Sequence, residues 1–130
     1  QSLKMNNEVS EIFSVEEFIP SAGQGIICLQ CRENDDEILS ILEKVNHKET
    51  SQRANAERNV LKILEGDCET AVGAHAKIYG NEISLETELF SLDGSQRFYE
   101  KKTAKIEKAK ELGIEVGKIL KLKSNNLYKR

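Results

Sequence analysis

Cys68 is the residue of this chain whose position is most suggestive of covalent chemistry. It follows Gly66 and Asp67, between an expected helix and an expected strand. A thiol in such a loop can carry an attached group, because sulfur is intrinsically nucleophilic. The C-terminal end of a helix disfavours the thiolate, since the helix dipole places partial negative charge there. Cys68 therefore suits one attachment to a strongly electrophilic partner better than repeated nucleophilic catalysis.

The other two cysteines, Cys28 and Cys31, have the Cys-x-x-Cys spacing of many zinc and redox sites. They lie in an apolar run that predicts a buried strand over residues 26–31. On a strand, residues three apart point to opposite faces, so the two sulfur atoms would not converge. The sequence contains no second cysteine or histidine pair to complete a zinc site. We expect both cysteines to be packing residues and expect no metal site; a thiol-redox or metal protein is the less favoured alternative.

The composition describes an ordinary soluble domain. The 130 residues suffice for one compact domain, or for one domain and a fragment of another. A net charge of −3 argues against a nucleic-acid site, and no apolar run is long enough for a membrane helix. The polar first residues do not resemble a signal peptide, and the first residue is not Met. We expect a cytoplasmic monomer that binds neither nucleic acid nor membrane, and a chain that is a piece of a longer protein.

Apolar spacing predicts the elements that position Cys68. Before it, helical spacing predicts two helices, and Asn34 and Asp35 are suitable caps for the first. After it the period changes to two, and Asp93-Gly94 predicts a hairpin turn. From residue 46 onward the predicted order is helix, strand, strand, strand, helix, at residues 50–65, 74–79, 83–89, 97–99 and 106–120.

This order predicts an α+β fold, with a three-stranded antiparallel sheet that helices cover on one face and water covers on the other. Gly113 and Gly117, four residues apart in the last helix, predict close helix packing. His47 and His75 are far apart in sequence, and neither belongs to a motif that would pair it with Cys68. The residues alone thus predict an accessible thiol on a helix-covered sheet and no complete active site.

Five short segments occur in a fixed order along the chain: Pro20-Ser21-Ala22-Gly23-Gln24-Gly25, Cys31-Arg32, Asn46-His47-Lys48-Glu49-Thr50, Ala56-Glu57-Arg58 and Leu64-Glu65-Gly66-Asp67-Cys68. In this order they resemble the C-terminal part of porphobilinogen deaminase, also called hydroxymethylbilane synthase. Asp93-Gly94-Ser95 also fits that family. The resemblance covers essentially the whole chain.

The resemblance implies a transferase of tetrapyrrole and heme biosynthesis. Members of the family condense four porphobilinogen molecules into hydroxymethylbilane and release ammonia at each condensation. A dipyrromethane cofactor, bound by a thioether to a cysteine of the third domain, primes the growing chain, and Cys68 stands at that position. Gln24 and Gly25 match the hinge segment near the cofactor cleft, which implies cofactor or substrate contacts; a tight turn is the structural alternative. Arg58 is expected to form a structural ion pair.

The resemblance also implies a division of the chain. Residues 1–45 would be the end of domain 2 and the segment that returns to domain 1, a remnant of helix tail, strand and helix from upstream α/β domains. Residues 46–130 would be the C-terminal, cofactor-carrying domain 3. The catalytic aspartate and the basic residues that hold the pyrrole carboxylates belong to the first two domains. The expected partners are therefore porphobilinogen, pyrrole intermediates and the missing N-terminal domains, and the fragment alone is expected to be inactive.

Two positions depart from the family pattern. Asp67 replaces a second glycine before the cysteine, and Thr70-Ala71 replaces a Val-Pro pair. Asp67 places a negative charge beside the thiol, which opposes its ionisation and disfavours the carboxylates of the cofactor.

The alternative from another functional class is a binding or scaffold protein without catalysis. In this alternative the chain is a stand-alone helix-on-sheet module, and Cys68 is only a loop residue.

Overall fold

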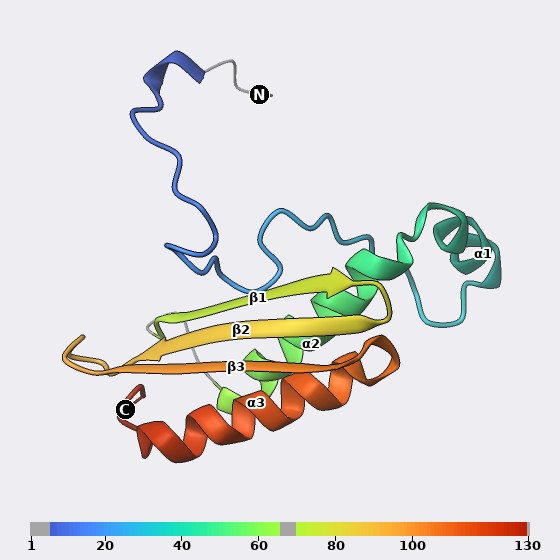
Figure 1. The fold of residues 1–130 in the computed structure, drawn as a ribbon. Helices are drawn as coiled ribbons and strands as arrows, with labels where there is room; N and C mark the ends of the chain where they lie inside the picture. Colours follow the sequence, from blue (N-terminus) through green and yellow to red (C-terminus); the bar gives the residue numbers. More distant parts are fainter. Residues whose placement is uncertain (1–5, 66–69, 130) are drawn as a thin grey trace.

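The computed structural model describes residues 6–65 and 70–129, and it contains a sheet backed by two long helices (Figure 1). The strands form one antiparallel sheet in the order β1-β2-β3. The helices α2 and α3 lie on one face of this sheet (Figure 1), which confirms the predicted α+β fold. The elements in chain order are η1 (Asn6–Glu8), α1 (Asp36–Val45), α2 (Lys48–Leu64), β1 (Val72–Tyr79), β2 (Glu82–Phe90), β3 (Arg97–Lys105), η2 (Ile106–Lys108) and α3 (Ala109–Ser124).

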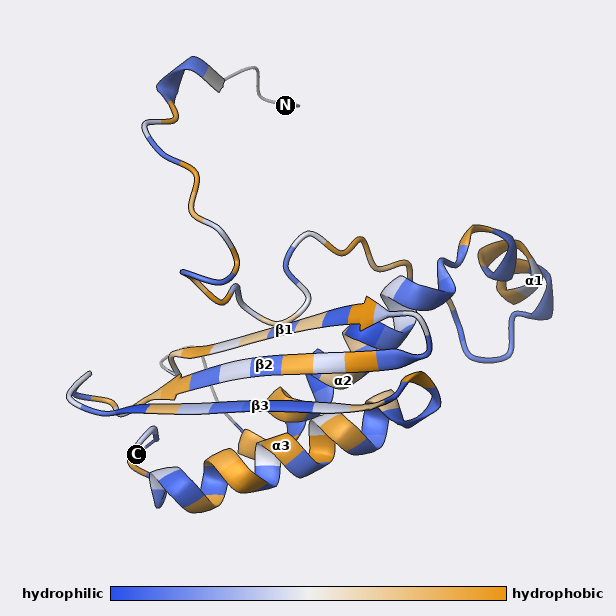
Figure 2. Ribbon diagram, in the orientation of Figure 1, coloured by the Kyte–Doolittle hydropathy of each residue, from blue (hydrophilic) through white to orange (hydrophobic). Residues whose placement is uncertain are grey.

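The core lies between the sheet and the two helices. Along β2, buried residues alternate with half-buried ones, because successive side chains of a strand point to opposite faces. Figure 2 shows this alternation as apolar and polar bands along the strand. The inward residues meet the apolar sides of α2 and α3 in one cluster that includes Val60, Leu64, Leu85, Leu120 and Tyr128.

Two glycines allow α2 and α3 to pack closely. A Cβ atom on Gly113 would lie 2.1 Å from the carbonyl oxygen of Ala56, and one on Gly117 would lie 2.8 Å from Cβ of Ile63. Neither distance is compatible with a side chain, so the two backbones approach each other where only glycine fits. The predicted role of the Gly113 and Gly117 spacing is confirmed.

The segment before α2 differs from the sequence prediction. Residues 26–31 form no strand, and Ile27 and Leu29 are 89% and 60% exposed. Cys28 is exposed and Cys31 is half-buried, both as free thiols, so the expectation that they pack in a buried strand is wrong. A strand needs a neighbour for its backbone N–H and C=O groups. An apolar run specifies a strand only where such a neighbour exists, and none lies beside residues 26–31 among the described residues.

The predicted helix before residue 46 is formed, but it is not packed. The Asp35 side chain caps α1 by accepting a hydrogen bond from the backbone nitrogen of Ile38 at 3.3 Å. No residue of α1 is buried, and its apolar residues Ile38, Ile41 and Val45 are 38% to 64% exposed. Ahead of it, the expected helix tail is reduced in the described residues to the single turn of η1. No helix in the described part of the chain has the length and apolar character needed to cross a bilayer.

Candidate functional site

The predicted attachment residue, Cys68, lies outside the described residues. The structure describes the segment before it, which ends α2, and the segment after it, which begins β1. The helix before it, α2, ends at Leu64, and Glu65 follows in the left-handed conformation with φ of 53°. The strand after it, β1, begins at Val72, which pairs with Leu89 of β2. In the sequence, residues 65–71 therefore connect the end of α2 to the start of β1.

The last residues of α2 are contacted from the C-terminal end of the chain. The hydroxyl of Tyr128 donates a hydrogen bond to the carbonyl oxygen of Leu64 at 2.7 Å, and Tyr128 is fully buried. Lys121 Nζ lies 2.9 Å from a carboxylate oxygen of Glu65, and Lys129 Nζ lies 3.7 Å from the same oxygen. The hydrogen bond from Lys121 lowers the pKa of Glu65 and reciprocally raises the pKa of Lys121. Burial raises the pKa of Tyr128, so its hydroxyl stays a donor at neutral pH.

Gln24 and Gly25 lie in an exposed turn, as their sequence context predicts. The backbone nitrogen of Gln24 donates a hydrogen bond to the carbonyl oxygen of Ser21 at 3.0 Å. The backbone nitrogen of Ile26 donates one to the carbonyl oxygen of Gly23 at 3.1 Å. Gly23 and Gly25 have φ of 77° and 75°, the left-handed region that glycine adopts without a steric cost. The side-chain oxygen of Gln24 accepts a hydrogen bond from the Ser21 hydroxyl at 3.1 Å. The turn therefore has a defined backbone, and Gln24 and Gly25 are exposed in it.

A buried carboxylate, Glu57 of α2, holds this turn against β1. One of its oxygens accepts a hydrogen bond from the Gly23 nitrogen and the other accepts one from the Ala76 nitrogen, both at 2.8 Å. Glu57 is only 4% exposed. A buried carboxylate is costly unless its oxygens are paired, and here two backbone N–H groups provide the partners.

The sequence prediction named the neighbouring Arg58 and not Glu57. Arg58 is exposed, and its expected ion pair is not found among the described residues. A signal was present in the sequence, since Glu57 lies beside Ala56 and three residues before Val60, within the inward side of the helix. An acid at such a position has to find partners inside the fold.

The segment around Pro20 also follows the outer edge of β1. The Ala74 nitrogen donates to the Pro20 carbonyl oxygen at 2.9 Å. A Cβ atom on Gly73 would lie 2.7 Å from the carbonyl oxygen of Ile19, so the two backbones are in direct contact. The segment that leads into the Gln24 turn thus lies beside β1, the strand that follows Cys68 in the sequence.

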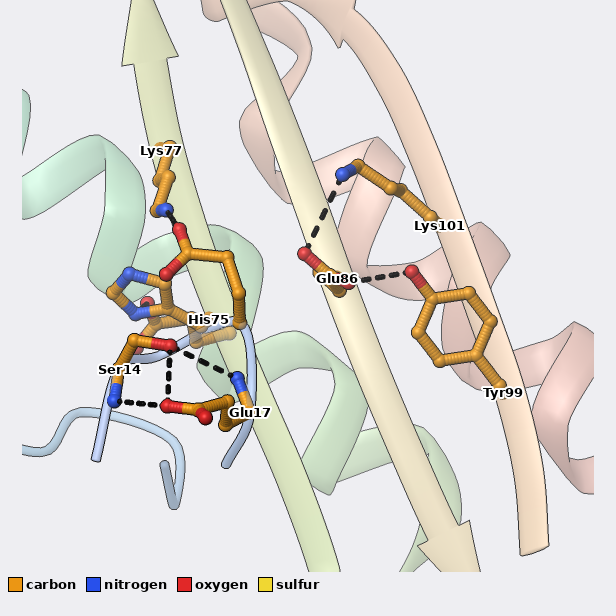
Figure 3. A network of polar contacts seen from close by, with 9 residues as sticks. Ser14, Glu17, His75, Lys77, Glu86, Tyr99 and Lys101 are labelled. Carbon is orange, nitrogen blue, oxygen red and sulfur yellow. Dashed lines mark hydrogen bonds and ion pairs between the residues drawn. The ribbon is translucent and has the colours of Figure 1, made fainter. Parts of the chain in front are cut away.

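The open face of the sheet carries a network of polar side chains (Figure 3), some of which line a small pocket. Glu86 accepts a hydrogen bond from the Tyr99 hydroxyl at 2.5 Å and lies 3.5 Å from Lys101 Nζ. The hydrogen bond to Glu86 raises the pKa of Tyr99 to about 12. Lys77 forms an ion pair with Glu16, from the segment that crosses this face. Each lysine here faces a carboxylate, so the pocket is a set of paired charges and not an activated acid or base.

His75 of β1 lies near the buried carboxylate of Glu57. Its Nδ1 atom lies 3.9 Å from a carboxylate oxygen of Glu57, and its side chain is 22% exposed. Among the residues that the structure describes, no three His, Cys, Asp or Glu side chains are grouped so that they could hold a metal ion.

Comparison with known proteins identifies the family. Residues 51–122 match the family model described as Porphobilinogen deaminase, C-terminal domain. The chain belongs to the porphobilinogen deaminase family. Residues 1–40 match a second model of the family, described as Porphobilinogen deaminase, dipyromethane cofactor binding domain. The Gln24 turn lies in the second match, and Cys68 lies in the first.

Relatives from several bacteria support the assignment. The chain is 38% identical over 112 residues to a porphobilinogen deaminase of Desulforamulus reducens, which covers 86% of this chain and 36% of the relative. It is 32% identical over 121 residues to a porphobilinogen deaminase of a Nostoc species, and the match covers 93% of this chain and 38% of the relative. It is 37% identical over 114 residues to a porphobilinogen deaminase of Coxiella burnetii, and the match covers 88% of this chain and 37% of the relative. The chain thus spans little more than a third of the length of these relatives.

The turn that contains Gln24 and Gly25 is open on its glycine side, and a contact with a dipyrromethane stays a prediction. A Cβ atom on Gly23 or Gly25 would meet no atom within 4 Å, so the glycine side of the turn is open. The oxygen of the Gln24 amide is engaged by Ser21, and its nitrogen is a donor suited to the carboxylates of a pyrrole. Gln24 and Gly25 could therefore hold such a group by hydrogen bonding and close backbone approach.

Proposed function

We propose that this chain is the C-terminal part of a hydroxymethylbilane synthase and that Cys68 is the attachment residue for its dipyrromethane cofactor. The observation that carries the proposal is the match of residues 51–122 to the family's C-terminal domain, within which Cys68 lies between α2 and β1. The whole protein would condense four porphobilinogen molecules into hydroxymethylbilane and release ammonia at each step.

The attachment needs only the chemistry of a soft thiol. As the bond between the methylene carbon and the amino nitrogen of porphobilinogen breaks, the sulfur of Cys68 forms a bond to that carbon. The amino group, protonated as an ammonium, leaves as ammonia and the thiol proton is released to solvent, so atoms and charges balance. The methylene carbon that loses ammonia is a strong electrophile, so the thiol reacts with it without a catalytic base. The bound dipyrromethane supplies the anchored acceptor on which the chain grows.

The division of the chain at residue 45 is part of the same proposal. Residues 1–45 would complete domains 2 and 1, and residues 46–130 would form domain 3. The two family matches, at residues 1–40 and 51–122, support this division. The exposed apolar residues of α1 and of residues 26–31 support it too, because exposed apolar surface of this kind is typical of an interface. Their partner would be the upstream domains of the same protein.

The fragment alone is proposed to be inactive. Its described residues contain paired charges and no complete set of acid, base and substrate cations. The catalytic aspartate and the cations for the pyrrole carboxylates would come from the upstream domains. We also propose a cytoplasmic monomer that binds neither nucleic acid nor membrane; the net charge of −3 supports only the absence of nucleic-acid binding.

Intact-mass measurement tests the attachment. The chain, extended by the residues that its gene encodes ahead of Gln1, should carry the added mass of two linked pyrroles. Cys68→Ser should lose that mass, and the matched variant Cys28→Ser should keep it, because Cys28 is exposed in another segment. An adduct that survives Cys68→Ser would refute the assigned residue. No adduct in the parent protein would favour a scaffold without catalysis, and porphobilinogen turnover by the isolated 130 residues would refute the proposed division.

A further inference from the structure

The end of α2 is held by residues from the other end of the chain, at the base of the loop that contains Cys68. We define the loop stem as Leu64 and Glu65, and the C-terminal anchor as Lys121, Tyr128 and Lys129. Tyr128 and Leu64 are 64 residues apart in sequence. In Figure 1 the C-terminus lies at the same end of the molecule as the last turn of α2.

The anchor satisfies carbonyl groups that the helix itself leaves unpaired. The last carbonyl oxygens of an α-helix have no partner within it. The Leu61 oxygen accepts from the Glu65 nitrogen at 3.0 Å, and the Ile63 oxygen accepts from Lys121 Nζ at 3.4 Å. The Leu64 oxygen accepts from the Tyr128 hydroxyl at 2.7 Å. Two of these three partners come from the anchor, so the direction in which the chain leaves α2 depends on it.

The anchor is itself fixed in place. After α3, Asn125 and Asn126 have φ of 45° and 61°, a left-handed turn that asparagine tolerates better than most residues. The turn reverses the chain, so that the ring of Tyr128 enters the core. The Leu127 oxygen accepts a hydrogen bond from the Leu92 nitrogen at 2.9 Å, which ties the anchor to the residues that follow β2.

Resting on the proposed function, we infer that Tyr128 and Lys121 are positioning residues that place the loop stem for covalent loading of Cys68. The stem ends three residues before Cys68, and β1 begins four residues after it. Only two residues of sequence separate the stem from Cys68, so the contacts that hold the stem determine where the segment that carries the thiol begins. In this inference the anchor acts through Leu64 and Glu65, which it contacts, and not by contact with the cofactor or porphobilinogen.

Amide hydrogen exchange tests the contact itself. The Glu65 nitrogen donates to Leu61 and so reports on the last turn of α2. Tyr128→Phe keeps the buried ring and removes the hydroxyl donor, so exchange at Glu65 should become roughly 3- to 10-fold faster, as expected for one lost hydrogen bond. Tyr99→Phe is the matched control, because its hydroxyl binds Glu86 on the open face. Unchanged exchange in Tyr128→Phe, or an equal change in the control, would overturn the inference.

Covalent loading tests the functional consequence. Full-length apoprotein would be mixed with porphobilinogen and the adduct followed by intact mass, well below the melting temperature. Tyr128→Phe combined with Lys121→Met should load roughly 3- to 10-fold more slowly. The loss should fall on the limiting rate at saturating porphobilinogen and not on the half-saturating concentration, because neither residue contacts substrate. A purely structural role would not produce this separation.

The controls separate this inference from the proposed function. Lys123→Met is matched to Lys121→Met, because Lys123 is also ion-paired in the last turn of α3 but to Glu100. Lys121→Arg should restore loading. If the parent loads and the anchor variants load equally fast, the positioning role is overturned while the proposed function stands. If the parent gains no adduct that depends on Cys68, the proposed function fails and the positioning role falls with it.

Discussion

A carboxylate oxygen of Glu57 lies 2.8 Å from the backbone nitrogen of Ala76, which donates a hydrogen bond to it. The other oxygen accepts from Gly23. A single buried side chain of α2 thereby joins the outer edge of β1 to the turn that contains Gln24. The two regions that it joins fall in the two separate family matches. Because Glu57 contacts both regions, a shift of the C-terminal domain would also shift the turn.

Replacing Glu57 should destabilise the fold. Glu57→Ala leaves two N–H groups without their acceptor and should lower the free energy of unfolding by about 2–3 kcal/mol. Glu57→Gln keeps one acceptor but turns an amide donor toward Gly23 or Ala76, and about half of that loss is expected. Urea denaturation measures both. Glu115→Gln, at an exposed ion pair with Lys102, should change stability by less than about 0.5 kcal/mol; a Glu57→Ala protein as stable as this control would contradict the prediction.

Gly113→Ala should reverse the usual sign of a glycine-to-alanine change in a helix. In an exposed helix interior the change stabilises by about 1 kcal/mol. Here the new Cβ atom would lie 2.1 Å from the Ala56 carbonyl oxygen, and we expect a loss of about 1–3 kcal/mol from overpacking. Thermal or urea unfolding measures it, with Lys118→Ala on the exposed side of α3 as the control. A stabilised Gly113→Ala protein would show that α2 and α3 are not in such close contact.

Gly73→Ala should release the Ile19 segment from the edge of β1. Its Cβ atom would lie 2.7 Å from the Ile19 carbonyl oxygen, a backbone atom that cannot rotate away. The neighbouring hydrogen bond from Ala74 to Pro20 should weaken, and exchange of the Ala74 amide should become roughly 5- to 10-fold faster. The Phe90 amide, which donates to Ala71 on the inner side of β1, is the internal control. Equal acceleration at both amides would mean general destabilisation and would count against a local effect.

Asp93 should make the hairpin between β2 and β3 sensitive to acid. Hydrogen bonds from the Ser91 hydroxyl, the Ser95 nitrogen and the Ser95 hydroxyl lower the pKa of Asp93 from its ordinary value of 3.8 to about 2. Because the pKa is lower in the folded state, the contribution to stability is present above pH 3.8 and is lost as the pH falls through about 2. Asp93→Asn should remove this part of the pH dependence between about pH 4 and pH 2. A carboxyl titration followed by NMR, with a midpoint near 3.8, would disprove the prediction.

The elements of the C-terminal region follow from the sequence because their signals are local. The alternation of residues 83–89 determines which face of β2 is buried, and the apolar stripe from Val60 to Leu64 determines which side of α2 packs. Gly113 and Gly117 identify the helix contact because only glycine permits it. The five ordered segments were sufficient to identify the family. These features are properties of residues close together in the chain.

The tertiary structure decided the features that depend on distant partners. Residues 26–31 have the composition of a strand but form none, because strand formation needs backbone groups of a neighbour and not only apolar side chains. Glu57 is buried because Gly23 and Ala76 bring two donors to it, and Tyr128 is buried because a turn after α3 returns it to Leu64. The sequence by itself determined the periodic elements and the family. Which polar groups are buried, and what contacts the end of α2 ahead of Cys68, depended on hydrogen bonds between residues 19 to 64 positions apart.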